Sequence, residues 1–223
     1  PDVVCLQEIK ATPSQVPAAL CGIEGYSCYW HGGAKGYSGV GLLVRTGEGA
    51  NPVHFYHPEF DFENRIVVAV VQDVHCASVY VPNGGKDFAA KMRFLEALRS
   101  YADRLQKNKT ELVLCGDLNV ARAELDVHPK ERRQVIGQLP EERVLFERIL
   151  ETGLVDLGRM LDPDNEGMFT WWAPWRNMRA RNIGWRLDYI LASDKLTRRV
   201  SSCSVQASIG TSDHAPVVAT FRH

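Results

Sequence analysis

The 223-residue sequence predicts an α/β sandwich, in which one β-sheet packs on another and helices cover the outside. Three observations support this fold class. Strand-like runs outnumber helical ones, and the two kinds alternate without a linker, a repeat or a low-complexity segment. Hydrophobic residues make up 45% of the chain, which is enough to build a sizeable core. We therefore expect residues 1–223 to form one domain.

The first half of the chain contains several strands and two helices. Thr12 to Gln15 has the form of a capping box with proline at the first helical position, which predicts the start of a short helix. Apolar residues spaced three and four apart predict an amphipathic helix over 87–107. Strands are expected at 3–8, 26–31, 39–45, 66–72 and 75–81, with a loop at 32–36 and a hairpin turn at Asp73.

The second half is mostly strands. Residues 111–116 form a strand-like run directly after the long helix. Pro140 and Gly153 mark the two ends of another helix, with acidic residues in its first turn. Further strands are expected at 168–172, 186–191, 203–209 and 216–221.

The net charge of −1 argues against a protein that is basic over its whole surface, but the charge is unevenly distributed. Residues 111–170 contain seven Lys/Arg and thirteen Asp/Glu, whereas residues 171–200 contain seven Lys/Arg and only two acidic residues. A local basic face would suit a polyanion bound on one side. A solvated charged surface explains the same count equally well.

The cysteines predict a reduced protein. The six of them form no C-x-x-C pair and no zinc-like spacing. Cys5, Cys76 and Cys115 lie in apolar strand patterns, where a thiol behaves as a small hydrophobe. A disulfide between Cys21 and Cys28 is the less favoured alternative. No apolar run approaches the roughly 18 residues of a membrane span, and no signal peptide is visible.

Acidic residues follow, interrupt or precede four hydrophobic strand-like runs, and this pattern carries the most information about function. The residues are Glu8, Asp117, Asp188 and Asp213. A carboxylate at the end of a buried strand costs free energy unless it is paired, hydrogen-bonded or bound to a metal. Four such residues, drawn from distant parts of the chain, predict strand ends that converge on one acidic site with a hard cation.

Gly116-Asp117-Leu118-Asn119 is the strongest single motif. Asp117 and Asn119 are two residues apart, so both side chains project to the same side of an extended segment. A carboxylate there can accept a proton from water, and an amide can donate to a phosphate oxygen. On its own, however, the motif is better explained as an Asp/Asn turn at a strand end.

The other acidic residues also allow more than one interpretation. Glu8 is long enough to reach a hard cation, which prefers oxygen ligands, although an exposed glutamate at a helix start would look the same. Asp188 lies in an otherwise apolar run and needs a partner. The adjacent pair Asp213-His214 offers one, because an imidazole oriented by a carboxylate is a recurrent device. We expect Asp188 and His214 to lie within hydrogen-bonding distance.

Two further groups of residues fit a binding surface. Tyr80 and Asn83 flank a proline in a loop after a strand, a common place for functional groups, although a turn explains them too. Four of the five tryptophans fall within fifteen residues and are interleaved with arginine: Trp171, Trp172, Trp175 and Trp185. Aromatic side chains can stack on bases or line a pocket for an extruded nucleotide. We expect at least one of the four to be core packing instead.

Taken together, these motifs resemble the exonuclease III family of abasic-site endonucleases, within the wider endonuclease/exonuclease/phosphatase superfamily. The matching segments occur in the family's order at residues 1–8, 36–40, 79–84, 116–120, 184–191 and 212–216. Each segment alone is weak, but the ordered set is highly specific.

The resemblance assigns a role to each candidate residue. By it, Glu8, Asp213 and Asp117 lie at or near a Mg²⁺ site, with Mn²⁺ as a substitute, and Asp117 also activates or orients the attacking water. The remaining catalytic residues would be Tyr80, Asn119, Asp188 and His214. The residues that would bind or flank the DNA are Asn83, Lys86, Trp171, Trp175, Trp185 and Leu187.

The resemblance also implies a four-layer, DNase I-like sandwich of two mainly antiparallel sheets flanked by helices. The implied activity is hydrolysis of the phosphodiester 5′ to abasic sites in double-stranded DNA. Exonuclease activity from 3′ to 5′, and 3′-phosphodiesterase activity on 3′ blocking groups, would accompany it. Such a protein works as an intracellular monomer in the cytoplasm or nucleoid of bacteria or in the nucleus of eukaryotes, without membrane contact.

Two alternatives stand beside this interpretation. Members of the family normally begin with a strand that carries a metal-binding Asn or Asp, and this chain starts after that strand. A truncated DNA-binding remnant without catalysis is therefore one alternative. The other is a phosphodiesterase of the same superfamily that acts on a phospholipid or an inositol phosphate, which the Trp/Arg cluster makes less favoured.

Overall fold

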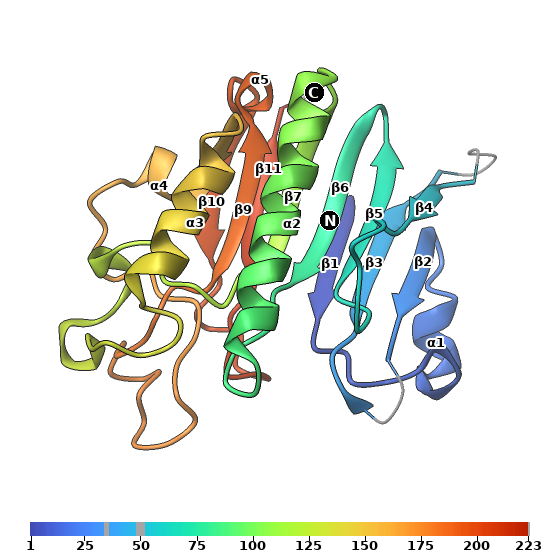
Figure 1. The fold of residues 1–223 in the computed structure, drawn as a ribbon. Coiled ribbons are helices and arrows are strands. Elements are labelled where there is room, and N and C mark those ends of the chain that lie inside the picture. Colours follow the sequence, from blue (N-terminus) through green and yellow to red (C-terminus); the bar gives the residue numbers. More distant parts are fainter. Residues whose placement is uncertain (34–35, 48–51, 223) are drawn as a thin grey trace.

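The computed structural model describes residues 1–33, 36–47 and 52–222. A six-stranded sheet runs through the centre in the order β4–β5–β6–β7–β9–β8 (Figure 1). Its strands are β4 (His54–Tyr56), β5 (Ile66–Val71), β6 (Val74–Tyr80), β7 (Glu111–Asp117), β8 (Leu154–Asp156) and β9 (Asp188–Ser193). Neighbours are antiparallel except β6 and β7, which are parallel because α2 (Phe88–Lys107) carries the chain back between them.

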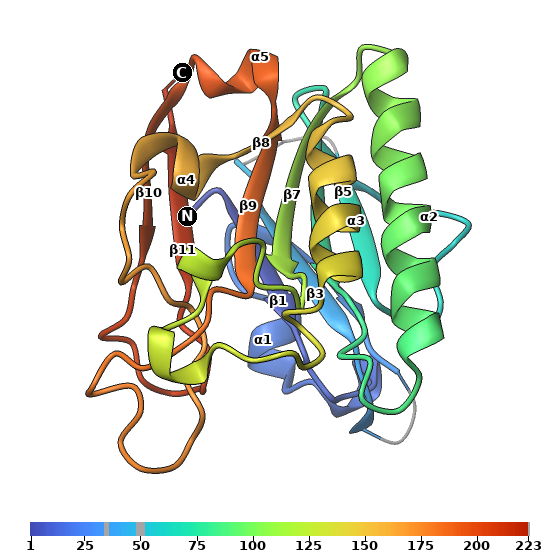
Figure 2. The ribbon, with the colours of Figure 1, turned by 60° about the vertical axis from the view of Figure 1, so that its left-hand side comes forward.

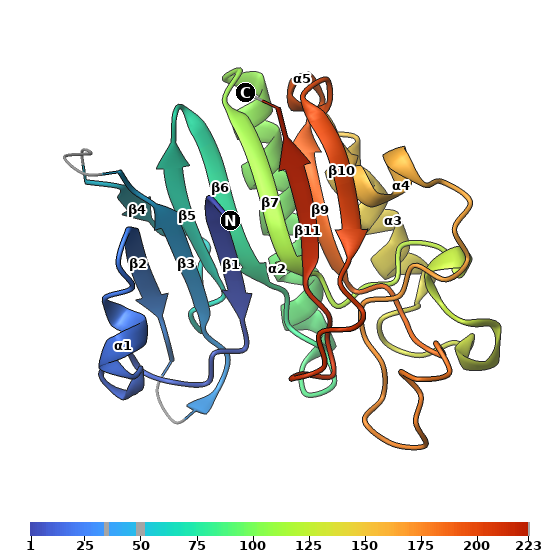
Figure 3. The same cartoon turned by 180° about the vertical axis from the view of Figure 1, so that it is seen from behind.

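A second β layer covers one face of this sheet and is divided in two among the described residues. One part is a three-stranded antiparallel sheet of β1 (Val3–Gln7), β3 (Val40–Arg45) and β2 (Tyr26–His31), in that order across the sheet. The other is the pair β10 (Val200–Val205) and β11 (Val217–Phe221). Figure 3 shows both parts in front of the central sheet, with β1 and β11 as their facing edges. The core between the layers includes Leu42 of β3 and Val67 of β5.

Two helices cover the other face of the central sheet (Figure 2). In α2, Phe94, Leu95, Leu98 and Ala102 are buried, which is the three- and four-residue spacing of one helical face. Asp87 caps the first turn by accepting a 2.8 Å hydrogen bond from the Ala90 amide. The second helix is α3 (Pro140–Leu150). The short helices are α1 (Ala18–Cys21), α4 (Leu157–Leu161) and α5 (Asp194–Thr197), with 3-10 turns at Pro13–Gln15, Glu124–Asp126 and Pro129–Glu131.

The predicted α/β sandwich is confirmed, and most predicted elements lie where the sequence placed them. The hairpin of β5 and β6 turns at Gln72 and Asp73, which both have positive φ. The predicted helix at Thr12 is only a 3-10 turn, and α1 follows it as a separate helix. The predicted loop at 32–36 includes residues 34–35, which lie outside the described residues. The six cysteines are all free, as expected.

Three strand predictions need correction. Residues 168–172 form no strand, because their backbone groups bond to two different segments: Trp171 bridges both Trp185 and His214. Strand β9 begins at Asp188 rather than 186, since the Arg186 amide bonds to the Asp126 carbonyl instead of a neighbouring strand. Strand β10 ends at Val205 rather than 209, where the chain turns.

The strand ends carry the candidate site to one edge of the molecule. Glu8 follows β1, Tyr80 ends β6, Asp117 ends β7 and Asp188 begins β9. In Figure 1 the ends of β1, β6 and β7 and the start of β9 all lie at the lower edge of the layers. Among the described residues, no helix combines the length and the apolar character needed to cross a bilayer.

Candidate active site

Ten of the predicted site residues line one cavity of about 340 Å³ at this edge. They are Glu8, Tyr80, Asn83, Asp117, Asn119, Trp171, Trp185, Leu187, Asp213 and His214. Asp117 and Asn119 are buried and form the floor of the cavity, whereas Glu8, Asn83 and Asp213 are exposed at its rim. Three of the four strand-end carboxylates, Glu8, Asp117 and Asp213, therefore meet at one cavity.

Asp188 and His214 form the expected pair. The Nδ1 atom of His214 lies 2.8 Å from Asp188 Oδ2, so Nε2 is the ring nitrogen left for the cavity. The hydroxyl of the buried Thr170 accepts hydrogen bonds from the amides of Leu187 and Asp188, at 2.9 and 3.0 Å, and fixes the start of β9. Asp188 itself lies behind His214 and does not line this cavity.

The surroundings of His214 favour its charged form. Burial by itself lowers the pKa of His214, but the hydrogen bond to Asp188 and the negative charges of Asp188, Asp117 and Asp213 outweigh burial and raise the pKa to about 9. The imidazole is therefore cationic at neutral pH. A cation with an N–H at the cavity can donate to an anionic oxygen bound there.

Asp117 and Asn119 hold each other in position. Asp117 accepts hydrogen bonds from the Asn119 amide at 2.8 Å and from its side-chain Nδ2 at 3.0 Å. Asn119 takes a positive φ of 51°, which asparagine tolerates better than most residues, and its Nδ2 also donates to the Val81 carbonyl at 2.9 Å. The two side chains thus form a rigid turn at the end of β7.

The pKa of Asp117 is raised to about 7. Burial is the main cause, followed by the charge of Asp188, which lies opposite Asp117 across the strand pair. A carboxyl group with this pKa is a competent proton acceptor near neutral pH.

Tyr80 orients Glu8. The Tyr80 hydroxyl donates to Glu8 Oε1 at 2.5 Å, and the other carboxylate oxygen pairs with the Lys10 ammonium at 3.1 Å. Burial, and then Glu8, raise the pKa of Tyr80, so its hydroxyl stays a hydrogen-bond donor. The Arg65 guanidinium lies 4.9 Å from the centre of the Tyr80 ring and braces the ring from behind.

Three carboxylates around the cavity suit a hard cation that keeps part of its water shell. Glu8, Asp117 and Asp213 offer oxygen donors only, the type that Mg²⁺ prefers. Among the described residues, these three do not draw together within 4.8 Å of one another. This geometry therefore does not allow all three carboxylates to coordinate one Mg²⁺ ion directly. It does allow one or two of them to bind the ion, with water as the other ligands.

Aromatic side chains form the wall of the cavity. Trp171 and Trp185 pack edge to face, with ring centres 5.6 Å apart, and the Trp171 indole donates to Asp213 at 2.9 Å. The Trp185 indole N–H is buried without a hydrogen-bond partner among the described residues. Leu187 lies beside them. The wall thus combines apolar surface with one free donor.

Lys86 and Trp175 lie outside this cavity. Lys86 is exposed, and its ammonium lies 5.1 Å from the centre of the Tyr37 ring. Trp175 is 59% exposed. Both side chains are on the surface, where they can contact a large ligand that covers the cavity. Trp172 is the tryptophan that serves as core packing.

Three residues that contribute to the site were missed from the sequence. Ile136 and Gly137 line the cavity from the loop before α3, and no pattern marks them. Lys91 is completely buried in α2, and its ammonium donates to the Asn119 carbonyl at 2.7 Å. Its position on the apolar face of a predicted helix was a signal that could have identified it.

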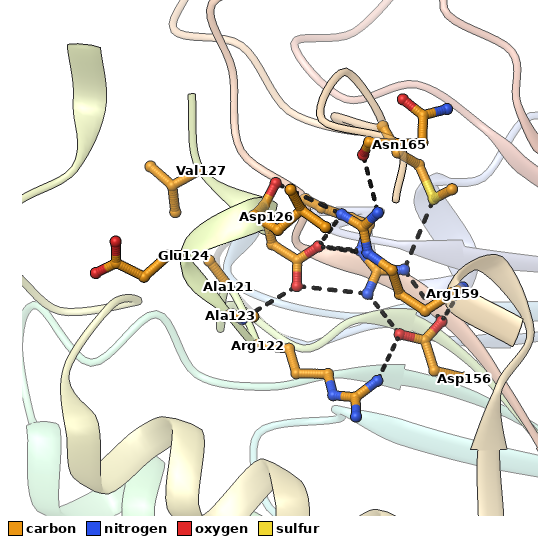
Figure 4. A network of polar contacts seen from close by, with 12 residues as sticks. Ala121, Arg122, Ala123, Glu124, Asp126, Val127, Asp156, Arg159 and Asn165 are labelled. Atoms are coloured by element: carbon orange, nitrogen blue, oxygen red, sulfur yellow. Dashed lines mark hydrogen bonds and ion pairs between the residues drawn. The ribbon is translucent and has the colours of Figure 1, made fainter. Parts of the chain in front are cut away.

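The predicted basic face over 171–200 is not continuous. The Arg186 guanidinium is buried and pairs with Asp126 and Asp156. Figure 4 shows these two carboxylates in a polar network with Arg122 and Arg159. Arg179 donates to the carbonyls of Ala207, Ser212 and Ile209 and so holds the loop before Asp213. Lys195, Arg198 and Arg199 lie in or next to α5, at the opposite edge from the cavity (Figure 1).

Comparisons with known proteins identify the family of this chain. The Endonuclease/Exonuclease/phosphatase family model matches residues 1–214. The exodeoxyribonuclease of Bacillus subtilis is 37% identical over 225 residues, which cover 97% of this chain and 86% of that protein.

Solved structures give the same result. A 3′ phosphatase from Neisseria bound to a product DNA hairpin superposes with a TM-score of 0.89 at 31% identity, over all of this chain and 90% of that one. An AP endonuclease from Archaeoglobus fulgidus superposes with a TM-score of 0.83 at 30% identity, over 99% of this chain and 89% of that one. The chain therefore belongs to the endonuclease/exonuclease/phosphatase family, in the group that contains exodeoxyribonucleases and AP endonucleases.

Proposed function

We propose that this protein is a Mg²⁺-dependent DNA repair nuclease that hydrolyses the phosphodiester 5′ to an abasic site in double-stranded DNA. The observation that carries the proposal is one cavity that holds both a hydrolytic centre and an aromatic wall. Removal of nucleotides and of blocking groups from 3′ ends would use the same centre.

The residues of the chain supply a route for hydrolysis. Asp117, with its raised pKa, accepts a proton from the attacking water, whose oxygen forms the new bond to phosphorus as the bond to the 3′ oxygen breaks. The His214 imidazolium donates to a non-bridging phosphate oxygen and balances the developing negative charge. Asn83 positions the phosphate, because its side-chain Nδ2 donates one N–H to Asn119 Oδ1 at 3.4 Å and keeps a second for a phosphate oxygen. Asn119, whose own Nδ2 is held by Asp117 and the Val81 carbonyl, keeps Asn83 and Asp117 in place.

A bound Mg²⁺ would neutralise phosphate charge and stabilise the leaving 3′ oxygen, and one or two of Glu8, Asp213 and Asp117, together with water, would hold it. Mn²⁺ accepts the same oxygen donors and should substitute for Mg²⁺. Tyr80 keeps Glu8 in the orientation that faces the cavity.

Selectivity for abasic sites follows from the wall of the cavity. A sugar without a base has lost the stacking and pairing that resist extrusion from the duplex, so turning it outward costs less free energy. Trp171, Trp185 and Leu187 offer it an apolar surface. The exposed Lys86 and Trp175 would contact the duplex on either side.

We also propose that residues 1–223 act as one domain and as a monomer inside the cell. Every residue of the site comes from this one chain, and β1 and β11, near its two ends, both pack on the central sheet.

The test is cleavage of a labelled duplex that carries one tetrahydrofuran abasic analogue, with Mg²⁺ and then with EDTA. We expect incision on the 5′ side of the analogue in Mg²⁺ alone, and none with His214→Ala. A folded protein that leaves this duplex intact in Mg²⁺ but hydrolyses a 3′-phosphorylated end would restrict the activity to 3′ ends. Turnover of an inositol phosphate in place of both DNA substrates would overturn the proposal.

A further inference from the structure

A cluster of two histidines and one aspartate lies outside the active site. His31 ends β2, and His57 and Asp61 lie in the segment between β4 and β5. Each offers one ligand atom, and the three atoms lie within 4.8 Å of one another. Among the described residues, this is the only group of three or more metal-ligating side chains that comes so close together.

In each of the three side chains, the polar atom that does not face the cluster already has a hydrogen-bond partner. His57 Nδ1 lies 3.1 Å from the Ile66 carbonyl, so Nδ1 carries the proton and Nε2 presents a lone pair, which accepts from the Tyr29 hydroxyl at 3.0 Å. Asp61 Oδ1 accepts the amides of Arg65 and Ile66, which leaves Oδ2 free for the cluster. Metal-binding side chains are typically oriented by such outer contacts.

His31 completes the group. Its Nε2 lies 2.6 Å from Asp61 Oδ2, and its Nδ1 lies 3.2 Å from the side-chain amide of Asn64. The His31 and His57 rings stack with their centres 3.7 Å apart. Ligands of a tetrahedral ion at about 2.0–2.1 Å stand about 3.3 Å from each other. The contact between His31 and Asp61 would therefore have to open by less than about 1 Å to admit an ion.

We propose that His31 Nε2, His57 Nε2 and Asp61 Oδ2 bind a divalent transition-metal ion of the Zn²⁺ type, with water in the fourth position. Two imidazoles and one carboxylate suit Zn²⁺ or Co²⁺ and disfavour Mg²⁺, which prefers oxygen donors. The ion takes the place of the proton between His31 Nε2 and Asp61 Oδ2, and the neutral His31 ring then carries its proton on Nδ1, which faces the Asn64 side-chain oxygen once that amide is turned. Both side chains of this pair are partly exposed, at 17% and 10%, so an ion can reach them.

The site is separate from the catalytic cavity but connected to it. Gln7 and His31 flank Val40 on its two sides, so the cluster lies at the same sheet edge as Glu8, two strands away. The Arg65 amide holds Asp61, and the Arg65 guanidinium contacts the ring and the carbonyl of Tyr80. A bound ion would tie the end of β2 to the loop that carries Arg65.

The test is Zn²⁺ binding to metal-stripped protein by titration calorimetry. The parent for all titrations carries Glu8→Gln and Asp213→Asn, so that the catalytic cavity does not contribute. We expect one Zn²⁺ per chain, retained in excess Mg²⁺. His31→Ala and His57→Ala should each weaken binding at least tenfold, whereas the matched control His54→Ala, an exposed histidine of β4, should not.

Thermal unfolding provides a second readout that does not depend on activity. Zn²⁺ should raise the melting temperature of the parent and of His54→Ala, but not that of His57→Ala. Absence of Zn²⁺ binding in the parent, or binding in His31→Ala and His57→Ala that is as tight as in the parent, would overturn the proposal. In that case His31 and Asp61 are a simple hydrogen-bonded pair, and the His31 ring stacks on His57.

Discussion

The Lys91 ammonium lies 2.7 Å from the backbone carbonyl oxygen of Asn119, in the core beneath the candidate active site. It also pairs with Glu142 of α3, and neither side chain of this pair is exposed. Glu142 in turn accepts the amides of Gly137 and Leu139, at 2.7 and 3.0 Å. One buried ion pair thus connects both long helices, the loop that lines the cavity and the turn that carries Asn119.

Replacing Lys91 with methionine should therefore destabilise the protein strongly. The change leaves the Glu142 charge buried without its partner, which typically costs about 3–5 kcal/mol. The measurement is the free energy of unfolding in urea. Lys107→Met is the matched control, because Lys107 is on the same helix and pairs with Asp103 at the surface. It should change stability by no more than about 0.5 kcal/mol. Equal effects of the two substitutions would show that the buried pair has no special role.

The pH dependence of cleavage should have two limbs. Asp117 must be deprotonated to accept a proton, so kcat/KM should rise as the pH increases through about 7. His214 must be protonated to donate, so kcat/KM should fall as the pH increases through about 9. A bound Mg²⁺ favours the carboxylate form of Asp117 and moves the first limb to lower pH.

The substitution Asp188→Asn tests whether Asp117 and His214 are the groups whose titration produces the two limbs. The charge of Asp188 raises the pKa of both Asp117 and His214, so its removal should move both limbs toward lower pH. It should also lower kcat/KM by about 10²-fold or more, because His214 loses its orienting carboxylate. The measurement is a pH profile of kcat/KM for both proteins. An alkaline limb that stays at the same pH would rule out His214 as the titrating group.

The same pair predicts a pH-dependent contribution to stability. The folded-state pKa of His214 lies above its usual value, so the stabilisation is fully present below about pH 6.5 and is lost as the pH rises through about 9. The difference in unfolding free energy between wild-type and His214→Ala should therefore shrink between pH 6.5 and pH 10. A difference that is constant across this range would mean that His214 is not held as a cation.

The sequence was most informative where a side chain conflicted with its local pattern. Asp188 interrupts an apolar run, which required a partner, and His214 is that partner. Lys91 shows the same conflict, but lysine in a helix usually extends to solvent, so the pattern alone does not predict its burial. The burial of Arg186 does not follow from the sequence either, because only the fold brings Asp126 and Asp156 around it.

Other features depend on contacts that no local pattern contains. The segment around Trp171 has strand-like composition, but it bridges two different segments and forms no ladder. His31 and His57 are far apart in sequence and meet only because β2 and the segment before β5 lie at one edge.

The two tryptophans Trp185 and Trp175 should have different effects on DNA cleavage. Trp185→Leu removes part of the cavity wall, so the preference for an abasic analogue over an intact nucleotide should fall by about tenfold or more. Trp175→Leu changes an exposed residue outside the cavity. It should weaken DNA binding without altering that preference. The measurement is kcat/KM on duplexes with and without the analogue, and a loss of preference in Trp175→Leu alone would contradict this assignment.

Glu8→Gln should raise the Mg²⁺ concentration needed for half-maximal cleavage by at least about tenfold, because an amide is a weaker ligand for a hard cation than a carboxylate. Tyr80→Phe should have a smaller effect of the same kind, since it removes the hydrogen bond that orients Glu8 and leaves the carboxylate in place. Lys10→Met is a control that should change the Mg²⁺ requirement in the opposite direction. Lys10 competes with a cation for the same carboxylate, so its removal should lower the Mg²⁺ requirement slightly. If all three variants needed the same Mg²⁺ concentration as the wild type, Glu8 would be excluded from the metal site, and Asp213 and Asp117 would remain as its ligands.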